Sequence, residues 1–314
     1  MVPMTRYLTR RFLHGVVTLV ALSVISFLLV RLAPGDASDL IGGTQASPEQ
    51  RAAIRESLGL NQPLITQYWN YLSNVVRGDF GTTIVGSSPI GPLLANAAVP
   101  TLWLAGASII MTLVIAITLG ILASRRPGGF VDVISGGLTV AGMAMPSFWI
   151  GIMLVVFIAL PTGLFPIGGW PADTGARLNA IILPAFALSL TIIPVLLKSL
   201  RSSLISIGDS DYVHVSRSLG NQGFGLLTKT LFRNAVIPMI PLAASMMAYL
   251  FGGTVIIETT FGLPGLGQML VQGTKSRDAN IVLGVVLIIG VLVVLSNIVA
   301  DVVRGLLDPR VRLA

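Results

Sequence analysis

Six apolar segments, each about as long as a membrane is thick, constrain this chain more than any other feature. A helix needs about 20 apolar residues to cross the hydrocarbon core of a bilayer. The chain is also only 11% charged, against about 25% in a typical soluble domain. We therefore predict an all-α membrane protein with six transmembrane helices. The apolar segments lie at 12–30, 101–123, 133–160, 178–197, 234–257 and 279–300.

The charged residues between these segments predict the orientation of the chain. An even number of spans places both termini on one side, and that side carries 13 of the 20 Lys and Arg residues but only five of the 13 Asp and Glu residues. Lys and Arg accumulate on the cytoplasmic side of membrane proteins. Both termini and the loop at 208–233 are thus predicted to be cytoplasmic. The net charge of +7 is assigned to the anionic lipid surface, and nucleic acid is excluded as a partner.

The spans divide the chain into four parts. Residues 1–32 are predicted to form the cytoplasmic N-terminus and an uncleaved first helix, 33–97 an extracytoplasmic loop, 98–305 a five-helix core and 306–314 a cytoplasmic tail. In the loop, the sequence Ser47-Pro48-Glu49-Gln50 predicts a capping box and a short helix that stops at Gly59. Residues 63–77 predict a second helix, whose aromatic residues suit the membrane interface. We interpret the loop as a lid on the outer ends of the spans rather than a ligand site.

Residues that would support catalysis are missing. The chain has no phosphate-loop pattern and no cysteine, and neither His14 nor His214 has a carboxylate at metal-ligand spacing. We predict that the chain is not an enzyme and binds no metal. Its spans are also nearly free of charged residues, which ion-coupled transporters usually keep as relays. If the chain transports a solute, the energy must come from a partner.

The loop at 208–233 contains a short amphipathic helix that could receive that energy. Tyr212, Val215 and Leu219 recur on one helical face, while His214, Arg217 and Ser218 fall on the other side. A helix of this kind in a water-facing loop can lie in the groove of a partner protein.

Small residues and prolines mark the third and fourth segments. In the third, small residues let helix backbones approach closely, which fits either a pathway wall beside Met143, Met145 and Pro146 or plain helix packing. Pro146, Pro184 and Pro194 are either hinges or tolerated kinks. In the last segment, the i, i+3 spacing of Asp301 and Arg304 predicts a local salt bridge. The small residues of the third segment are Gly136, Gly137, Ala141, Gly142 and Ala144.

Short motifs follow one another in a fixed order along nearly the whole chain. They lie at 31–36, 58–63, 78–81, 211–220, 232–238, 258–267 and 308–312. In this order and spacing they resemble the first permease subunit of ABC importers for dipeptides, oligopeptides and nickel. One departure is Ser216-Arg217-Ser218-Leu219, where members of that family commonly have Ala-Arg-Ala-Lys.

The resemblance implies a type I ABC importer permease fold with a scoop-like loop after the first helix. The matching segment 258–267 supplies candidates for an extracytoplasmic gate or docking surface, namely Glu258, Phe261 and Pro264. The segment 211–220 is implied to be the helix that couples to the ATPase, with contributions from Asp211, Tyr212, His214, Val215, Ser216, Arg217, Ser218 and Gly220.

The resemblance also implies partners in a bacterial cytoplasmic (inner) membrane. They are a homologous second permease, which forms a heterodimer with this chain, two ATPase subunits that hold ATP and Mg, and an extracytoplasmic solute-binding protein. This chain would hold no cofactor and would form half of a pathway for di- or oligopeptides by alternating access. Import of a nickel chelate, glutathione or another small solute, a stand-alone secondary transporter, and a scaffold or receptor without transport remain alternatives.

Overall fold

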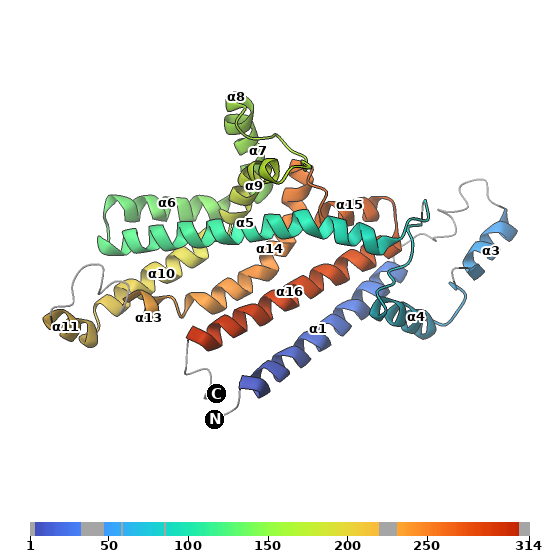
Figure 1. The fold of residues 1–314 in the computed structure, drawn as a ribbon, viewed down its shortest axis with the longest axis horizontal. Coiled ribbons are helices and arrows are strands. Elements are labelled where there is room, and N and C mark those ends of the chain that lie inside the picture. Colours follow the sequence, from blue (N-terminus) through green and yellow to red (C-terminus); the bar gives the residue numbers. More distant parts are fainter. Residues whose placement is uncertain (1–3, 33–46, 58, 85, 220–230, 308–314) are drawn as a thin grey trace.

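The fold is built almost entirely from helices. The computed structural model describes residues 4–32, 47–57, 59–84, 86–219 and 231–307. Within these ranges, extended backbone pairs only at an isolated bridge between Thr82 and Pro89. The longest helices lie side by side, and Met4 and Leu307 are found at one end of them, here termed the terminal end (Figure 1). The opposite end, termed the loop end, carries α3 (Pro48–Ser57), α4 (Leu64–Val76) and α15 (Leu266–Lys275).

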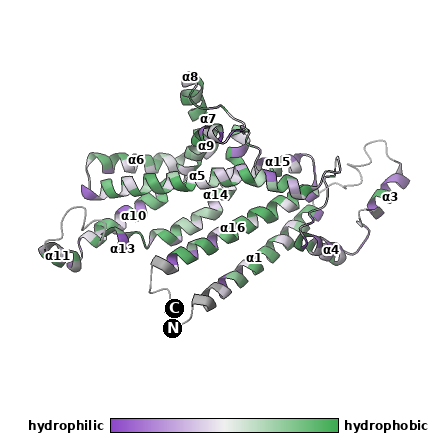
Figure 2. Ribbon diagram, in the orientation of Figure 1, coloured by the Kyte–Doolittle hydropathy of each residue, from purple (hydrophilic) through white to green (hydrophobic). Residues whose placement is uncertain are grey.

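Four helices are each long and apolar enough to cross a membrane. They are α1 (Met4–Leu32), α5 (Ile90–Arg125), α14 (Met239–Phe261) and α16 (Ala279–Leu307). Their residues are mostly hydrophobic, in contrast to those of the hydrophilic α3 (Figure 2). Each overlaps one predicted span, although α5 begins well before residue 101 and α14 begins after residue 234. Six spans are reached among the described residues only if two bent helix pairs are each counted as one span.

The third predicted span, 133–160, is not a continuous helix. α6 (Phe130–Ala144) is followed by Met145 and Pro146, and the chain then turns by 110°. A proline disfavours the helical conformation of the residue before it, and Met145 is indeed extended, with φ −101° and ψ 130°. We term this bend the elbow. Its second arm consists of α7 (Ser147–Leu154), the π-helix η1 (Val155–Ala159) and α8 (Leu160–Thr162).

The fourth predicted span, 178–197, is also broken. It is replaced by α9 (Thr174–Ser189) and α10 (Ile193–Gly208), which are bent by 62°. Pro194 stands in the first turn of α10, where the N–H that proline lacks would have no helical partner anyway. Pro184, by contrast, lies inside α9 without ending it. Of these two prolines, only Pro194 marks the break.

The loop helices begin and end largely as predicted. At the start of α3 the capping box is formed, because the backbone N–H of Ser47 donates to Oε1 of Gln50 (3.0 Å) and that of Gln50 donates to Oγ of Ser47 (3.2 Å). α4 contacts α1 through the rings of Tyr68 and Tyr71, which lie against Phe27. Burial raises the pKa of Tyr71 to about 12, so this ring stays neutral.

The main core lies where α5, α9, α10 and α14 meet. α9 buries side chains around most of its circumference, among them Ile181, Leu183 and Leu188, as expected of a helix enclosed by its neighbours. α10 packs closely on α5, since a Cβ atom on Gly120 would lie 3.1 Å from Cδ2 of the buried Leu200. This core fixes α10, the helix that leads toward the predicted coupling helix.

The helices α1 and α16 lie side by side, and α16 also packs against α14 of the core. Their backbones approach closely, because a Cβ atom on Gly15 would lie 2.6 Å from Val294 and one on Gly290 would lie 2.3 Å from Leu22. Near the terminal end, Nε of Arg11 lies 3.0 Å from Oδ2 of Asp301. The predicted local pairing of Asp301 with Arg304 is thus replaced by an ion pair between two helices.

Candidate functional site

The predicted coupling helix is present as α11 (Asp211–Ser218), at the far terminal end of α10 (Figure 1). Val213 is fully buried, and the backbone N–H groups of Val213 and His214 donate to the carbonyl of Ser210, between α10 and α11. Val215 and Leu219, predicted to share one face, are 59% and 77% exposed. An apolar pair held out of the protein in this way is available to a partner.

The other predicted residues of this helix are mostly at its surface. Asp211, His214 and Ser218 are exposed, and Ser216 is half-buried. The hydroxyl of Ser218 donates to the carbonyl of His214 (3.1 Å), a bond within the helix. The side chains of Tyr212 and Arg217, and the whole of Gly220, lie outside the described part of the chain.

An ion pair connects α10, the helix that leads into α11, with α6. The guanidinium of Arg201 donates to both oxygens of Asp132, and its Nη2 atom lies 2.7 Å from Oδ2. The same Oδ2 accepts the backbone N–H of Gly128 at 2.8 Å, which ties the pair to the turn between α5 and α6. Two parallel hydrogen bonds fix both the distance and the relative angle of the two side chains. The pair therefore fixes α10 to α6 at this point.

The three residues predicted to line a pathway sit at the elbow of α6 and α7. Met143 and Met145 are 71% and 39% exposed, and Pro146 is exposed as well. An apolar cavity of about 260 Å³ opens in the angle of the bend, with Met145, Trp149 and Phe157 among its lining residues. The exposed elbow is free to contact a second protein or a solute.

Only one glycine of the small-residue cluster in α6 makes a close helix contact. A Cβ atom on Gly142 would lie 2.4 Å from the carbonyl oxygen of Leu190, at the break between α9 and α10. At Gly136 and Gly137 a Cβ atom would meet nothing within 4 Å. Plain helix packing thus explains Gly142, which holds the two breaks of the chain against each other. It does not explain the two open glycines.

The loop end is organised around a buried carboxylate, that of Glu258. This side chain is fully buried near the end of α14, and its Oε2 atom accepts the backbone N–H groups of Gly267 (2.7 Å) and Gln268 (3.1 Å). Its Oε1 atom accepts the hydroxyl of Thr101 (2.7 Å), whose oxygen in turn accepts the N–H of Leu266 (2.8 Å). The first N–H groups of a helix lack helical partners and favour an anion nearby. Glu258 and Thr101 together therefore cap α15.

Two glycines allow this carboxylate to reach the start of α15. A Cβ atom on Gly265 would lie 2.3 Å from Cδ of Glu258, and one on Gly267 would lie 2.4 Å from the backbone Cα of Val255. A larger residue at Gly265 would displace the Glu258 carboxylate, and one at Gly267 would force α14 and α15 apart. The glycines of the segment 258–267 thus allow a close approach of two helices.

Of the three residues predicted for a gate or docking surface, only Pro264 is exposed. Phe261 is 2% exposed, and its carbonyl accepts the N–H of Gly169 at 2.9 Å. Glu258 and Phe261 therefore act from the interior, where they set the position of the loop that presents Pro264.

Pro264 borders a hollow at the loop end. The hollow has a volume of about 640 Å³ and lies between the start of α5, α15 and the segment before α9. Polar groups from Asn96, Arg177, Gln268 and Gln272 line it together with Trp170. Arg177 is held in place, since its guanidinium lies over the Trp170 ring and its Nε donates to the carbonyl of Pro171 (2.8 Å). The hollow is a candidate surface for a polar partner.

The interhelical partners were not predictable from the motifs. Thr101 and Glu258 are 157 positions apart, and Asp132 and Arg201 are 69 apart. The sequence indicates only that a single charged residue beside an apolar segment needs a partner of opposite sign, and it does not say which residue that partner is. Among the described residues, no group of three or more His, Asp or Glu is arranged to hold a metal ion.

Comparison with known families gives a match over most of the chain. Residues 116–313 match the family described as binding-protein-dependent transport system inner membrane component. Residues 4–92 match the corresponding N-terminal family. The break between the two matches falls inside α5.

Individual relatives match over nearly their full length. A probable peptide ABC transporter permease, y4tP of Sinorhizobium fredii, is 33% identical over 309 residues, covering 98% of this chain and 99% of that protein. The oligopeptide transport system permease AppB of Bacillus subtilis and the glutathione transport system permease GsiC of Salmonella choleraesuis show the same identity and coverage. A solved structure of the MetNI methionine ABC transporter in an inward-facing conformation has a similar fold, with a TM-score of 0.55 and 19% identity over 69% of this chain and 96% of that one.

Proposed function

Because this chain belongs to the family of binding-protein-dependent transport system inner membrane components, we propose that it forms half of the translocation pathway of an ATP-driven importer for di- or oligopeptides. As a permease subunit it is not itself an enzyme. The observation that carries the proposal is the full-length match to permeases named for peptide transport. The substrate class is taken from those relatives.

The terminal end is proposed to face the cytoplasm. The excess of Lys and Arg on that side supports this orientation. α11 then lies where an ATPase subunit can reach it, with Val215 and Leu219 as the apolar contacts. ATP and Mg would be held by two such ATPase subunits and not by this chain.

Transmission of motion is proposed to run from α11 to the elbow. ATP-driven closure of the ATPases would displace α11, and α10 would follow because only Asp209 and Ser210 separate the two helices. The ion pair between Arg201 and Asp132 would carry the displacement to α6, and the contact of Gly142 with the break at Leu190 would carry it to the elbow. A homologous second permease, in a heterodimer, would supply the other half of the pathway.

The loop end is proposed to receive an extracytoplasmic solute-binding protein. The exposed Pro264 and the polar hollow beside it support this assignment. Because α15 is capped by Glu258, the docking surface is connected directly to α14. A binding protein seated there could sense and bias the state of the core.

Uptake of labelled peptide into liposomes tests the class of transporter. The full complex, with both permeases, the ATPases and the binding protein, is expected to take up a labelled dipeptide only with ATP. Uptake should persist when a protonophore dissipates the proton gradient. Loss of uptake under the protonophore with ATP present would support a secondary transporter, and absence of flux under all conditions would support a scaffold.

The ligand that purifies with the binding protein tests the solute. A peptide is expected. A glutathione permease among the relatives makes glutathione the second candidate. A nickel chelate or glutathione in the binding protein would overturn the peptide assignment and leave the permease assignment intact.

A further inference from the structure

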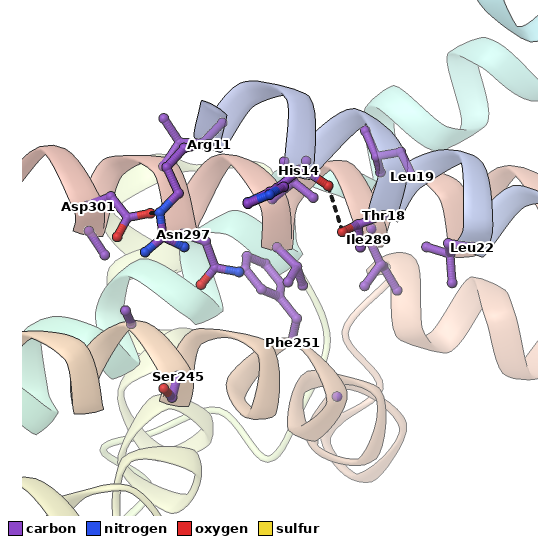
Figure 3. A pocket seen from close by; sticks show the side chains of 18 of the residues that line it. Arg11, His14, Thr18, Leu19, Leu22, Ser245, Phe251, Ile289, Asn297 and Asp301 are labelled. Carbon is purple, nitrogen blue, oxygen red and sulfur yellow. Dashed lines mark hydrogen bonds and ion pairs between the residues drawn. The ribbon is translucent and has the colours of Figure 1, made fainter. Parts of the chain in front are cut away.

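A groove runs along the membrane-spanning part of the molecule, between α1 and α14. Its floor is α16, against which both of these helices pack. The cavity has a volume of about 720 Å³ (Figure 3), and it shares no lining residue with α11, with the cavity at the elbow or with the hollow beside Pro264.

The two ends of this groove differ in chemistry. At the terminal end the lining includes Arg11, Asn297, Asp301 and Arg304. Toward the loop end it consists of apolar side chains, such as those of Leu22 and Ile289 (Figure 3). The polar groups are thus gathered at one mouth of an otherwise apolar trench.

Water is a poor occupant of such a space. A water molecule takes about 30 Å³ in the liquid, so the cavity would hold roughly two dozen. Most of them would face leucine, isoleucine, valine and phenylalanine side chains, to which they cannot hydrogen-bond. An occupant with a long apolar part and a polar head matches the walls better.

The charge at the polar mouth selects the sign of that head. Arg11 and Asp301 form an ion pair that is neutral overall, and Arg304 adds one positive charge on the same helix face as Asp301. His14 and Asn297 supply further polar groups beside them. Basic pockets between transmembrane helices on the cytoplasmic side suit anionic lipid headgroups.

We propose that this groove is a binding site for one anionic phospholipid of the cytoplasmic leaflet. Its phosphate lies at the mouth beside Arg304, and an acyl chain lies along α16 between α1 and α14. The bound lipid fills the space between the first helix and the core. The leaflet assignment rests on the proposed orientation of the terminal end, whereas the binding itself can be measured without transport.

Native mass spectrometry of the detergent-purified full-length chain tests the site. Phosphatidylglycerol added to the delipidated protein is expected to give one retained molecule per chain, and phosphatidylcholine is expected to be lost under the same conditions. Arg304→Gln should weaken phosphatidylglycerol retention about fivefold, the effect of one basic residue near an anionic headgroup. Equal retention of the two lipids, or no effect of Arg304→Gln, would overturn the proposal.

A variant that fills the groove gives an independent readout. Ser245 lines the groove from an exposed position on α14, and Ser245→Phe should abolish retention of phosphatidylglycerol. Ile256→Phe adds an aromatic ring at an exposed position on α14 that does not line the groove, and it should leave retention unchanged. A photo-reactive group at position 245 should label lipid in the assembled complex. Labelling of the second permease instead would show that a protein fills the groove, and would refute the lipid site while leaving the transport proposal untouched.

Discussion

The two ends of this molecule are built in opposite ways. At the loop end, a fully buried carboxylate, a threonine hydroxyl and two glycines hold α15 against α14 in close contact. At the terminal end, α11 follows α10 after only two residues, and the apolar side chains of Val215 and Leu219 are exposed. The loop end is held together by contacts within the chain, whereas the exposed apolar residues of the terminal end are free to contact a partner.

This difference separates stability from coupling. Substitutions at the loop end remove contacts that already exist in the isolated chain, so they should lower its stability. If α11 contacts the ATPase as proposed, substitutions on its outward face should leave the isolated chain stable and stop transport. The largest losses of stability are therefore expected at the loop end and the smallest on α11.

Glu258→Ala should destabilise the chain most. It leaves the N–H groups of Gly267 and Gln268 without their acceptor, and a buried unpaired polar group costs about 1–3 kcal/mol. We expect a total loss of about 3 kcal/mol or more, measured as a lower midpoint of thermal unfolding in detergent. Glu258→Gln keeps an acceptor oxygen and should lose less. Equal midpoints for Glu258→Ala and the wild type would remove the distinction between the two ends.

Gly267→Ala should follow, because its new methyl group would lie 2.4 Å from the backbone of Val255. The backbone of Val255 cannot move aside as a flexible side chain can. Overpacking of this kind typically lowers the free energy of unfolding by about 1–3 kcal/mol. The matched control is Gly106→Ala in α5, where a Cβ atom meets nothing within 4 Å. The control should be neutral or stabilising, since alanine favours helix. If both substitutions behave alike in thermal unfolding, the close approach of α14 and α15 is not required.

Asp132→Asn should have an intermediate effect. It weakens a charge-assisted pair of hydrogen bonds between α6 and α10, for which we expect a smaller loss of stability than at the loop end because the site is partly exposed. In the assembled importer we expect ATP hydrolysis to continue while uptake falls. The exchange Asp132→Arg with Arg201→Asp should restore part of the uptake. Unchanged uptake per ATP hydrolysed in Asp132→Asn would argue against transmission through this pair.

Val215→Asp combined with Leu219→Asp should leave the stability of the chain within about 0.5 kcal/mol of the wild type, as is usual for exposed positions. ATP-driven uptake by the assembled complex should nevertheless fall at least about tenfold, because the charges would be buried against the ATPase without partners. Ser206→Asp, at an exposed position on α10, is the control and should transport normally. Normal uptake by the double variant would show that α11 is not the coupling surface.

The sequence predicted features that depend on local composition and failed where distant residues meet. The membrane helices, the capping box at Ser47 and a helix at 211–218 follow from hydrophobic period and turn chemistry over a few residues. The elbow could not be predicted, because an apolar segment that contains a proline is compatible with one kinked span and with two separate helices. Gly142 differs from the open glycines of α6 because it packs against Leu190, which lies 48 positions away in the sequence. The residues around Gly142 do not reveal this contact.

The site shows the same limit. The motif at 258–267 identified Glu258, Phe261 and Pro264, but sequence alone could not reveal that two of them are buried. Thr101 carries no motif of its own, and it is recognised as part of the site only because α5 lies beside α14 in the fold. Periodicity can place a residue on a face of its helix, but not opposite a particular residue of another helix.

The neighbouring positions of α1 and α16 have a consequence for biosynthesis. α1 leaves the ribosome long before α16, yet Gly15 lies against Val294 and Arg11 is paired with Asp301. During translation, α1 therefore lacks this helical partner until α16 has been made. Such long-range closure is slow in folding. A nascent chain that stops before residue 290 lacks Val294 and Asp301, which contact α1. We expect membrane quality control to recognise the unpaired α1 of such a chain.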